Sequence, residues 1–495
     1  MSGNDPAQAT GTQAIAGAPG QAVAPRPTVN GETVEQALSR AQAAAQAKRL
    51  NEANGICADV LAAAPDQPAA LALQGIVAAL AGDPERGIVQ LRRAIELRPG
   101  NAAWYAHFSS LCRATYRMEE ALAAGQESIR LDANNPEHLV NLSLIFADVD
   151  DRDRAMTCLL RALGLKHDHA DGHLAMAQNL LAIGDFDAGW MEYEWRNQTE
   201  AGKATMPALT SAHWNGMRIP NGRLLLVGDQ GYGDTIQFAR YIPMAAERCQ
   251  EVVMGCSAEM GPLLANMPGV KQYCHRWTDV PGHAAHCRLS SLPYLFRTQL
   301  DTIPAKVPYL KADPARIAFW QKRLAKGSPP GVKRIGLAWT GRPTHPNDRR
   351  RSLPLAALKS LADAGPAAFV SLQKPMPARD RETLASFPGM IDLSDELMDF
   401  GETAAVLENL DLLITVDTAM GHLAGALNRP AWILTPKAAD WRWMLDREDS
   451  PWYPSVRLFR QRKPGNWEEP IERLRSTLRA ELVGSLVGSV AGNRH

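Results

Sequence analysis

The sequence has few cysteines, no excess of charge of either sign and no long apolar run. Seven cysteines in 495 residues, without a Cys-x-x-Cys pair, exclude a disulfide framework and indicate a reducing compartment. The 53 basic residues equal the 53 acidic ones, which argues against a general nucleic-acid binder. No apolar stretch approaches the roughly 18 residues that cross a bilayer, and no secretory signal opens the chain. We therefore expect a soluble, cytoplasmic protein without nucleic acid or an integral membrane segment.

Both ends of the chain differ in composition from the part between them. Residues 1–33 are mainly Ala, Gly, Pro, Gln and Thr, which bury too little surface to offset their ordering entropy. We therefore expect a disordered leader over 1–33 and a fraying tail over 481–495. The length between them suits about three domains of roughly 150 residues each.

Small residues recur every 34 positions between residues 34 and 204. One series is Ala41, Gly75, Ser109, Ser143 and Ala177, and a second is Ala53, Gly87, Ala121, Ala155 and Gly189. Each unit contains two amphipathic helices, and small side chains allow these helices to approach closely. The period and pattern resemble the tetratricopeptide repeat, and predict an all-α solenoid of about five repeats over 34–204.

A solenoid of this kind has a concave face that usually holds a peptide or a protein. We expect a protein partner there. The alternatives are that the helices only brace the rest of the chain or form a dimer, so oligomerisation stays open. The aromatic residues of 185–196 are expected to seal the solenoid against the segment that follows.

The pattern changes after about residue 205, where short strand-like runs alternate with helical ones. Such runs are 223–229, 251–256, 334–341, 367–374, 410–417 and 430–436. This alternation predicts parallel sheets, and the polar segment 326–333 separates two sets. We expect an α/β region of two doubly wound, Rossmann-like domains, 205–329 and 330–480. Their chemistry should lie in a crevice at the carboxyl ends of the strands.

The first candidate segment is the glycine-rich loop 228–235, between a strand and a helix. Gly231 and Gly233 permit a tight turn and a close backbone approach, and the helix N-terminus behind them favours negative charge. The loop lacks the pattern of a P-loop or a dinucleotide fingerprint. Asp234 is either a helix N-cap or a carboxylate that takes a proton from an acceptor hydroxyl.

The second segment is 417–423, after the apolar strand 410–416. Asp417 and Thr418 fall at the carboxyl end of this strand, where the first helical turn presents free amides. His422 lies about one turn further, near the place that a diphosphate would occupy. The alternative is a hydrogen-bonded histidine in a contact between strand and helix.

The third segment runs from Trp339 to Ser352 and contains three consecutive arginines. Such a charge run is usually solvated. Over a crevice, however, Arg350 and Arg351 would neutralise a leaving diphosphate, because Arg grips phosphate through paired hydrogen bonds.

Two further strand ends offer groups for the same ligand. Gln373 and Lys374 supply a donor and a cation, and Trp441 supplies an aromatic face for a base or a sugar. A zinc site is the alternative use of a separate cluster, Cys256, Cys274, His275, His283, His286 and Cys287. Structural zinc favours ligand pairs a few residues apart, but these cysteines do not pair, so we expect no metal.

Together these segments resemble a known family. The resemblance lies in GDQGYGDTIQFARYIP, LDTIPAKVPYL, HPNDRRRSLPL, SLQK, DLLITVDTAMGHLAGALNRPAWILTP and DWRWMLDREDSPWYPSVRLFRQ. They are similar to bacterial tetratricopeptide-repeat glycosyltransferases, whose catalytic half is similar to the heptosyltransferase family (glycosyltransferase family 9). The layout also resembles O-linked N-acetylglucosamine transferase. The resemblance covers about 34–475 and implies a GT-B fold of an acceptor-side and a nucleotide-sugar domain.

The resemblance implies an inverting, metal-independent transferase that needs no cofactor and takes a nucleotide-activated sugar as its donor substrate. Asp234 matches the family's base. The implied ligands of the donor sugar and phosphates are Asp417, Thr418, His422, Arg351, Gln373 and Lys374. Family members often carry Lys at the position of Arg351. Arginines and fixed amide dipoles can stabilise a leaving diphosphate in place of a divalent ion.

The acceptor is expected to be a protein docked on the repeats, because a small sugar needs no solenoid. Family members of this layout are associated with flagellin, so flagellin is the candidate acceptor. Two alternatives stay open. One is an interaction scaffold with a degenerate GT-B region, and the other is a transferase for a lipopolysaccharide or polysaccharide acceptor.

Overall fold

The computed structural model describes residues 28–229, 231–343, 345 and 347–492. These residues form two compact units that divide between Pro99 and Gly100, inside the repeat region. Unit 1 therefore contains only the first repeats, whereas unit 2 contains the later repeats together with both sheets.

The expected leader lies mostly outside the described residues, but its end has regular structure. Strands β1 (Thr28–Val29) and β2 (Glu32–Thr33) pair antiparallel. Thr33 then caps helix α1 (Val34–Gln46): its hydroxyl accepts from the Gln36 amide at 3.3 Å, and the Gln36 side chain accepts from the Thr33 amide at 3.0 Å. Residues 28–33 are thus part of the first repeat's structure and differ from the expected disorder.

Five helical hairpins follow one another in the described part of the repeat region. Unit 1 contains α1, α2 (Leu50–Ala63), α3 (Pro68–Leu80) and α4 (Pro84–Leu97). Unit 2 contains α5 (Ala102–Ala114), α6 (Met118–Leu131), α7 (Pro136–Asp148), α8 (Arg152–Leu165), α9 (Ala170–Ile183) and α10 (Phe186–Tyr193). The first helices begin at 34, 68, 102, 136 and 170, and the second at 50, 84, 118, 152 and 186. The predicted period of 34 residues is confirmed.

The small residues lie where the two helices of a hairpin touch. A Cβ on Gly75 would lie 2.9 Å from the carbonyl oxygen of Gly87, which belongs to the second series. Ala41, Ser109 and Ala177, from the first series, are fully buried. A larger side chain at these positions would force the paired helices apart.

The last hairpin is packed against the rest of unit 2 by aromatic rings, as expected. After α10 the chain forms a short helix, η1 (Glu194–Asn197), and then α11 (Glu200–Thr205). The ring of Trp190 lies 5.3 Å from that of Trp441 and 6.3 Å from that of Trp452. Its Nε1 donates to the Thr298 carbonyl at 2.9 Å. The end of the solenoid is therefore part of the core of the α/β region.

The first sheet has five parallel strands in the order β3-β7-β4-β5-β6. They are β3 (Ala212–His213), β4 (Ile219–Val227), β5 (Cys249–Gly255), β6 (Val270–Cys274) and β7 (Ala285–Arg288). The helices of this first lobe are α12 (Tyr232–Ala239), α13 (Ile242–Ala246), α14 (Gly261–Leu264), α15 (Leu292–Leu295) and α16 (Pro314–Ala325), with shorter turns at η2 (Ala258–Met260), η3 (Trp277–Asp279), η4 (Leu289–Ser291) and η5 (Leu300–Thr302).

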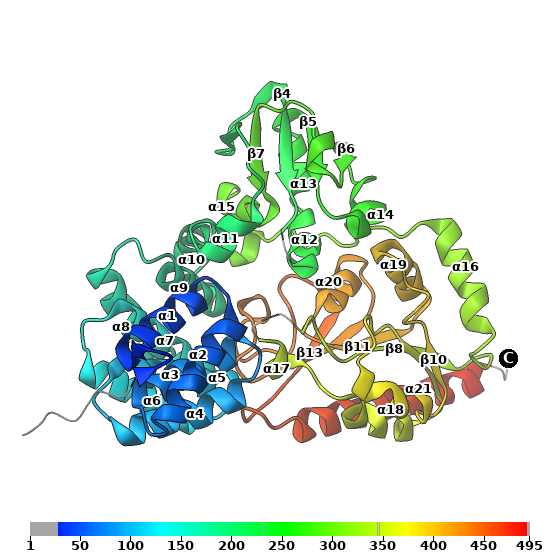
Figure 1. Ribbon diagram of the computed structural model, residues 1–495. Helices are drawn as coiled ribbons and strands as arrows, with labels where there is room; N and C mark the ends of the chain where they lie inside the picture. Colours follow the sequence, from blue (N-terminus) through cyan, green and yellow to red (C-terminus); the bar gives the residue numbers. More distant parts are fainter. Residues whose placement is uncertain (1–27, 230, 344, 346, 493–495) are drawn as a thin grey trace, which may run out of the picture. The chain divides into compact units, whose positions relative to one another are not determined.

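The second sheet has six parallel strands in the order β10-β9-β8-β11-β12-β13 (Figure 1). They are β8 (Lys333–Ala338), β9 (Ala367–Ser371), β10 (Met390–Asp392), β11 (Leu412–Val416), β12 (Ala431–Thr435) and β13 (Val456–Arg460). Its helices are α17 (Asp348–Arg351), η6 (Leu355–Ala364), η7 (Ala378–Asp380), α18 (Arg381–Ala385), α19 (Phe400–Glu408), α20 (Ala419–Ala426), η8 (Trp441–Trp443) and α21 (Glu468–Gly492). The last helix continues beyond the expected domain end at 480.

Both sheets confirm the predicted α/β fold class. In the second sheet the chain starts in the middle at β8, runs to the edge strand β10 and then returns to β11 on the other side of β8. In the first sheet the chain enters at the edge strand β3, continues from β4 to the opposite edge at β6, and returns to β7 between β3 and β4. From β4 and from β8 onward, both sheets have the doubly wound arrangement. The strand order therefore reverses between β4 and β7 in the first sheet and between β8 and β11 in the second. Ligands of such folds bind outside the carboxyl ends of the strands at this point. Among the described helices, none is both long and apolar enough to cross a membrane.

Candidate functional site

The loop after β4 carries Asp234 into the first turn of helix α12. The N-cap of this helix is Gly231, and Asp234 lies three residues further along. The alternative that Asp234 is an N-cap is therefore wrong. Its carboxylate Oδ1 instead lies 2.7 Å from Nη2 of Arg442, which belongs to the second lobe. A carboxylate of the first lobe thus contacts a guanidinium of the second.

The loop after β11 carries Asp417, Thr418 and His422 to the start of helix α20. Thr418 is the N-cap, and its hydroxyl accepts from the Met420 amide at 3.3 Å. Asp417 is buried at the end of the strand, and this burial, with the nearby Asp440 carboxylate, raises its pKa. The three residues therefore occupy the predicted place at the carboxyl end of the strand.

His422 is buried and held by Tyr453. Its Nδ1 lies 2.9 Å from the Tyr453 hydroxyl, and its ring packs against Trp443 at 5.1 Å. Burial, followed by the charge of Arg442, lowers the pKa of His422 to about 3. The ring is therefore neutral at physiological pH, and interacts through hydrogen bonding and packing rather than as a cation.

Helices α12 and α20 bring the two loops together. A Cβ built on Gly233 would lie 2.9 Å from Cδ2 and 3.3 Å from Nε2 of His422. It would also lie 3.7 Å from the Cα of Ala419, the first residue of α20. Glycine at 233 is thus required for this close approach, and the loops that carry Asp234 and His422 adjoin each other.

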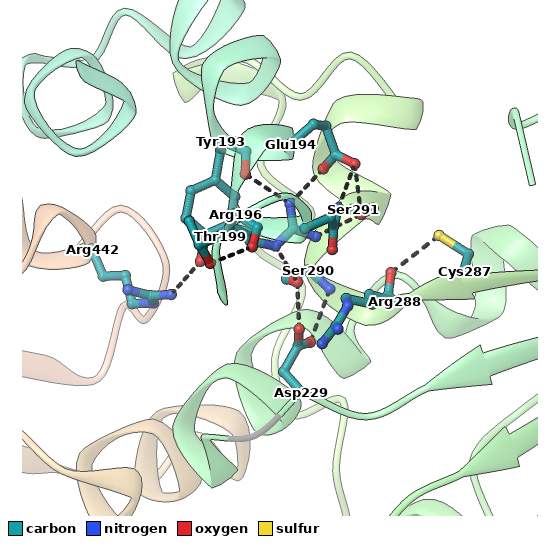
Figure 2. Close-up of polar contacts among 11 residues, drawn as sticks. Tyr193, Glu194, Arg196, Thr199, Asp229, Cys287, Arg288, Ser290, Ser291 and Arg442 are labelled. Atoms are coloured by element: carbon teal, nitrogen blue, oxygen red, sulfur yellow. Dashed lines mark hydrogen bonds and ion pairs between the residues drawn. The ribbon is translucent and has the colours of Figure 1, made fainter. Parts of the chain in front are cut away.

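Arg442, in η8, joins three parts of unit 2. Besides Asp234, its guanidinium pairs with Asp440 at 2.7 Å. The same guanidinium donates to the Tyr193 hydroxyl at 3.4 Å (Figure 2). It also lies over the Trp441 ring at 4.2 Å. Although burial opposes it, the guanidinium of Arg442 lowers the pKa of Asp440. Arg442 was not singled out from the sequence, because its partners lie about 200 and 250 residues away.

Arg351 is the last residue of helix α17, in the segment that follows β8. Its Nε is buried, 3.9 Å from the Asp348 carboxylate, with no hydrogen-bond partner among the described residues. Its charge acts on both Asp417 and His422. Gly341 makes room for it, since a Cβ there would lie 2.9 Å from Nη2 of Arg351. The role of Arg351 as a phosphate ligand stays a prediction.

Arg350 does not share this site. Its guanidinium pairs with the Asp148 carboxylate, at the end of α7, and donates to the Arg113 carbonyl at 3.2 Å. The expectation that Arg350 faces the diphosphate is therefore wrong. Arg350 and Arg351 are neighbours on the short helix α17, but Arg350 pairs with Asp148 whereas the charge of Arg351 acts on Asp417.

Gln373 and Lys374 are also used elsewhere. The Gln373 side-chain oxygen accepts from the amides of Trp339 and Thr340, at 3.0 and 2.9 Å. The Lys374 ammonium donates to the Leu397 carbonyl. The looser expectation that both bind the diphosphate does not fit these contacts. Gln373 instead fixes the loop after β8, which carries Trp339.

The two tryptophans proposed at the crevice are core residues. Trp339 is fully buried, and its indole Nε1 donates to Asp380 at 2.9 Å. Trp441 is 3% exposed, and its ring contacts those of Trp190, Tyr193 and Trp452. The expectation that Trp441 offers a free face to a base or sugar is therefore wrong.

A buried polar network lies at the base of the loop that carries Asp234 (Figure 2). Asp229 accepts from the Ser290 amide at 3.0 Å and from the Ser290 hydroxyl, across the point where the strand order reverses. Arg196, from η1, donates to the hydroxyls of Ser290 at 3.1 Å and Ser291 at 2.6 Å. Burial, with the nearby Asp234 charge, raises the pKa of Asp229 to about 6 despite the opposing charge of Arg196.

The Cys and His cluster of the first lobe is engaged in separate local contacts. His286 Nδ1 lies 2.8 Å from the Ser211 hydroxyl, and His283 Nδ1 lies 2.9 Å from the Pro281 carbonyl. Cys287 donates to the Arg288 carbonyl at 3.1 Å. Within the described ranges, no three His, Cys, Asp or Glu side chains gather as metal ligands.

Comparison with known proteins agrees with the expected combination of repeats and a glycosyltransferase region. The model of glycosyltransferase family 9 (heptosyltransferase) matches residues 395–434, which include Asp417, Thr418 and His422. The predicted resemblance to a tetratricopeptide-repeat protein with a heptosyltransferase-like region is confirmed at this level.

A curated relative spans both parts. Protein FlbA of Caulobacter vibrioides is 28% identical over 389 residues, which cover 71% of this chain and 63% of FlbA. Among solved structures, a thermophilic TPR protein in Thermus thermophilus is 19% identical, with a TM-score of 0.32, and the match covers 35% of this chain and 94% of that one. MamA from Desulfovibrio magneticus RS-1 is 13% identical, with a TM-score of 0.29, and the match covers 35% of this chain and 97% of that one.

Proposed function

We propose that this protein is an inverting glycosyltransferase that moves a sugar from a nucleotide-activated donor to a hydroxyl of a protein acceptor. The observation that carries the proposal is the meeting of Asp234 and Arg442, beside the contact of Gly233 with His422. A carboxylate of one doubly wound lobe thereby adjoins the family 9 match of the other. This arrangement supports the proposal that Asp234 is a base next to a group of anion-binding elements.

Asp234 acts as the base on the acceptor side. Its Oδ1 is held by Arg442, which leaves Oδ2 to take the proton from the acceptor hydroxyl. The hydroxyl oxygen forms a bond to the anomeric carbon as the bond from that carbon to the phosphate oxygen breaks on the opposite face. The electron pair leaves with the nucleoside diphosphate, and the configuration at the anomeric carbon is inverted.

The second lobe receives the leaving group. Arg351 offers a guanidinium whose Nε lacks a hydrogen-bond partner among the described residues. The first amides of α20, behind Thr418, favour negative charge at the same place. Neutral His422 contributes a hydrogen bond rather than a charge. Because these groups stabilise a diphosphate directly, we include in the proposal that no metal and no other cofactor is needed.

The repeats dock the acceptor, and we propose a protein, with flagellin the first candidate, modified in the cytoplasm. Five helical hairpins supply far more surface than a sugar needs, and the last three form one compact unit with the two lobes. A lipopolysaccharide or polysaccharide acceptor is the second candidate, because the matching family is described as a heptosyltransferase family.

The test is co-expression of the full chain with candidate flagellins, followed by intact-mass measurement of the acceptor. A hexose-like mass increase supports the protein acceptor and a nucleoside diphosphate as the leaving group. A nonulosonate-like increase supports the protein acceptor but replaces the diphosphate by CMP as the leaving group, because nonulosonates are activated as CMP sugars. Asp234→Asn should lower turnover by about two to four orders of magnitude while nucleoside diphosphate binding stays similar.

The matched control is Asp153→Asn, which removes an exposed carboxylate from the first turn of α8. We expect its turnover to equal that of the wild type. If Asp234→Asn modified the acceptor as fast as the wild type does, Asp234 would not be the base. If added lipopolysaccharide were modified while flagellin stayed unmodified, the proposal of a protein acceptor would be wrong and the second candidate, a lipopolysaccharide or polysaccharide acceptor, would take its place.

A further inference from the structure

The turn between helices α7 and α8 faces the donor-side lobe with two carboxylates. This turn, Asp148–Asp151, contains Asp148 as the last residue of α7 and Asp150 in the left-handed region at φ 67°. We call it the acidic turn. Its fourth residue, Asp151, is the N-cap of α8. Asp150 lies 3.7 Å from Nε of Arg152 in the same hairpin, and both Asp148 and Asp150 also make contacts outside the hairpin.

Asp148 binds Arg350, the arginine of α17 that points away from the candidate site. It pairs with Arg350 and accepts from Arg113 Nε at 2.5 Å, so one carboxylate lies between two guanidinium groups. Arg350 is 8% exposed and lies over the ring of Tyr116 at 5.6 Å. Such a buried pair is costly to break, since removal of one partner leaves an uncompensated charge.

Asp150 makes a second contact with the same lobe. Its Oδ2 lies 3.0 Å from Nζ of Lys437, just beyond the end of β12. The acidic turn is therefore attached to the second lobe at two points, one in the loop after β8 and one after β12. Two attachments fix the orientation of a turn as well as its position.

The loop that Arg350 anchors is a small hydrogen-bonded unit. The Ser352 hydroxyl donates to the Asp348 carboxylate at 2.8 Å and accepts from the Gly341 amide at 2.9 Å. Arg351 lies in this unit, next to Arg350, and is the arginine beside Asp417. A displacement of Arg350 is therefore transmitted to Arg351 through the short helix α17.

We propose that the acidic turn is a positioning element of the donor site, and that the repeats determine the position of Arg351 through their contact with Arg350. The consequence of this inference rests on the proposed function: the binding of an acceptor to the repeats is coupled to the binding of the donor nucleotide. An acceptor that shifts the α7–α8 hairpin changes the affinity for the nucleotide, and by linkage the nucleotide changes the affinity for the acceptor by the same factor.

The first experiment tests the coupling without any assumption about the reaction. Hydrogen–deuterium exchange of residues 347–352 is compared between the wild type, Asp148→Asn and Glu137→Gln. We expect Asp148→Asn to raise exchange in this loop about tenfold, because Arg350 and Arg113 then face each other without a counter-charge. Glu137→Gln removes an exposed carboxylate from the same helix, whose partner Lys166 lies within the repeats, and should leave the loop unchanged.

The second experiment measures the binding of UDP, GDP and ADP to the same variants by calorimetry. Asp148→Asn and Arg350→Gln should each weaken the nucleotide that binds best by about 2- to 30-fold. The double variant should be no weaker than either single one, because both substitutions remove the same contact. Arg350→Lys keeps one ion pair and should recover part of the affinity.

The outcomes separate the two proposals. Unchanged exchange of 347–352 in Asp148→Asn overturns the positioning role, whatever the protein binds. Raised exchange with unchanged nucleotide affinity overturns the link to the donor site. If the wild type binds none of the three nucleotides while the exchange effect is present, the proposed function fails and the coupling between turn and loop stands.

Discussion

The contact between the two lobes makes Gly233→Ala a direct test of the site's geometry. The new methyl carbon would lie 2.9 Å from Cδ2 of His422, closer than real Cβ atoms approach other heavy atoms. The imidazole cannot simply turn aside, because the Tyr453 hydroxyl holds its Nδ1 and Trp443 packs on its face. Helices α12 and α20 must therefore separate by several tenths of an ångström.

Two opposing terms set the size of the effect. Overpacking of a buried contact costs about 1–3 kcal/mol. Replacement of a helical glycine by alanine returns about 0.5–1 kcal/mol through backbone entropy. We expect a net loss of about 1–2 kcal/mol in the free energy of unfolding of unit 2, and a Tm about 1–3 °C below the wild type, because the entropy of unfolding of so large a unit is high.

The assay is thermal unfolding of the full chain, with Gly164→Ala as the matched control. Gly164 is also helical and lies in unit 2, but a Cβ there would have nothing within 4 Å. The control should melt at or slightly above the wild-type temperature. His422→Ala combined with Gly233→Ala should restore part of the loss, because the clash is removed. If Gly233→Ala melts like Gly164→Ala, the two loops do not touch, and the shared site is refuted.

Three further predictions concern charge at the site. The pKa of His422 is lowered to about 3 in the folded protein, against 6.5 in the unfolded one. The neutral imidazole therefore contributes to the free energy of unfolding above pH 6.5, and this contribution is lost as the pH falls from 6.5 toward 3. Between pH 7 and pH 5.5, the free energy of unfolding measured with urea should fall by about 1 kcal/mol more in the wild type than in His422→Gln. An equal fall in the two proteins would contradict the burial of a neutral imidazole. Arg442→Lys keeps the charge but not the fork that reaches Asp234, Asp440 and Tyr193, and should cost about 1–3 kcal/mol by the same assay; an unchanged midpoint would show that the three contacts do not form. Dialysis against excess EDTA should leave sugar transfer unchanged, and complete loss restored by Mg²⁺ or Mn²⁺ would end the metal-free proposal.

The repeats and the central strands could be predicted because their signals are local. The period of 34 residues sets every helix start in the solenoid, and small residues such as Gly75 mark the contacts within each hairpin. Buried parallel strands such as β4 and β11 appear as short, continuous apolar runs. Strands β3, β6, β7, β10 and β13 were missed, since runs of two to five residues, several of them polar, carry little periodicity. Among these, β7 is the one strand that lies inside its sheet.

The site could be predicted only in part, because its decisive contacts join residues far apart in the chain. Asp234 and His422 were found through the loops that follow their strands. No local signal indicates that Arg442 meets Asp234 and Tyr193, or that Arg350 turns to Asp148 while Arg351 does not. Trp441 shows the same limit: an aromatic residue at a strand end reads equally as a ligand platform or as core, and only packing decides.

The boundary at Pro99 and Gly100 divides the solenoid into parts with different evolutionary freedom. Hairpins three to five share buried charges and rings with the lobes, so few substitutions there are neutral. The first two hairpins belong to a separate compact unit with its own buried core, which includes Val34, Ala37 and Val60. Under the proposed function, substitutions that change the choice of acceptor would therefore be tolerated best in the hairpins that fold around their own core.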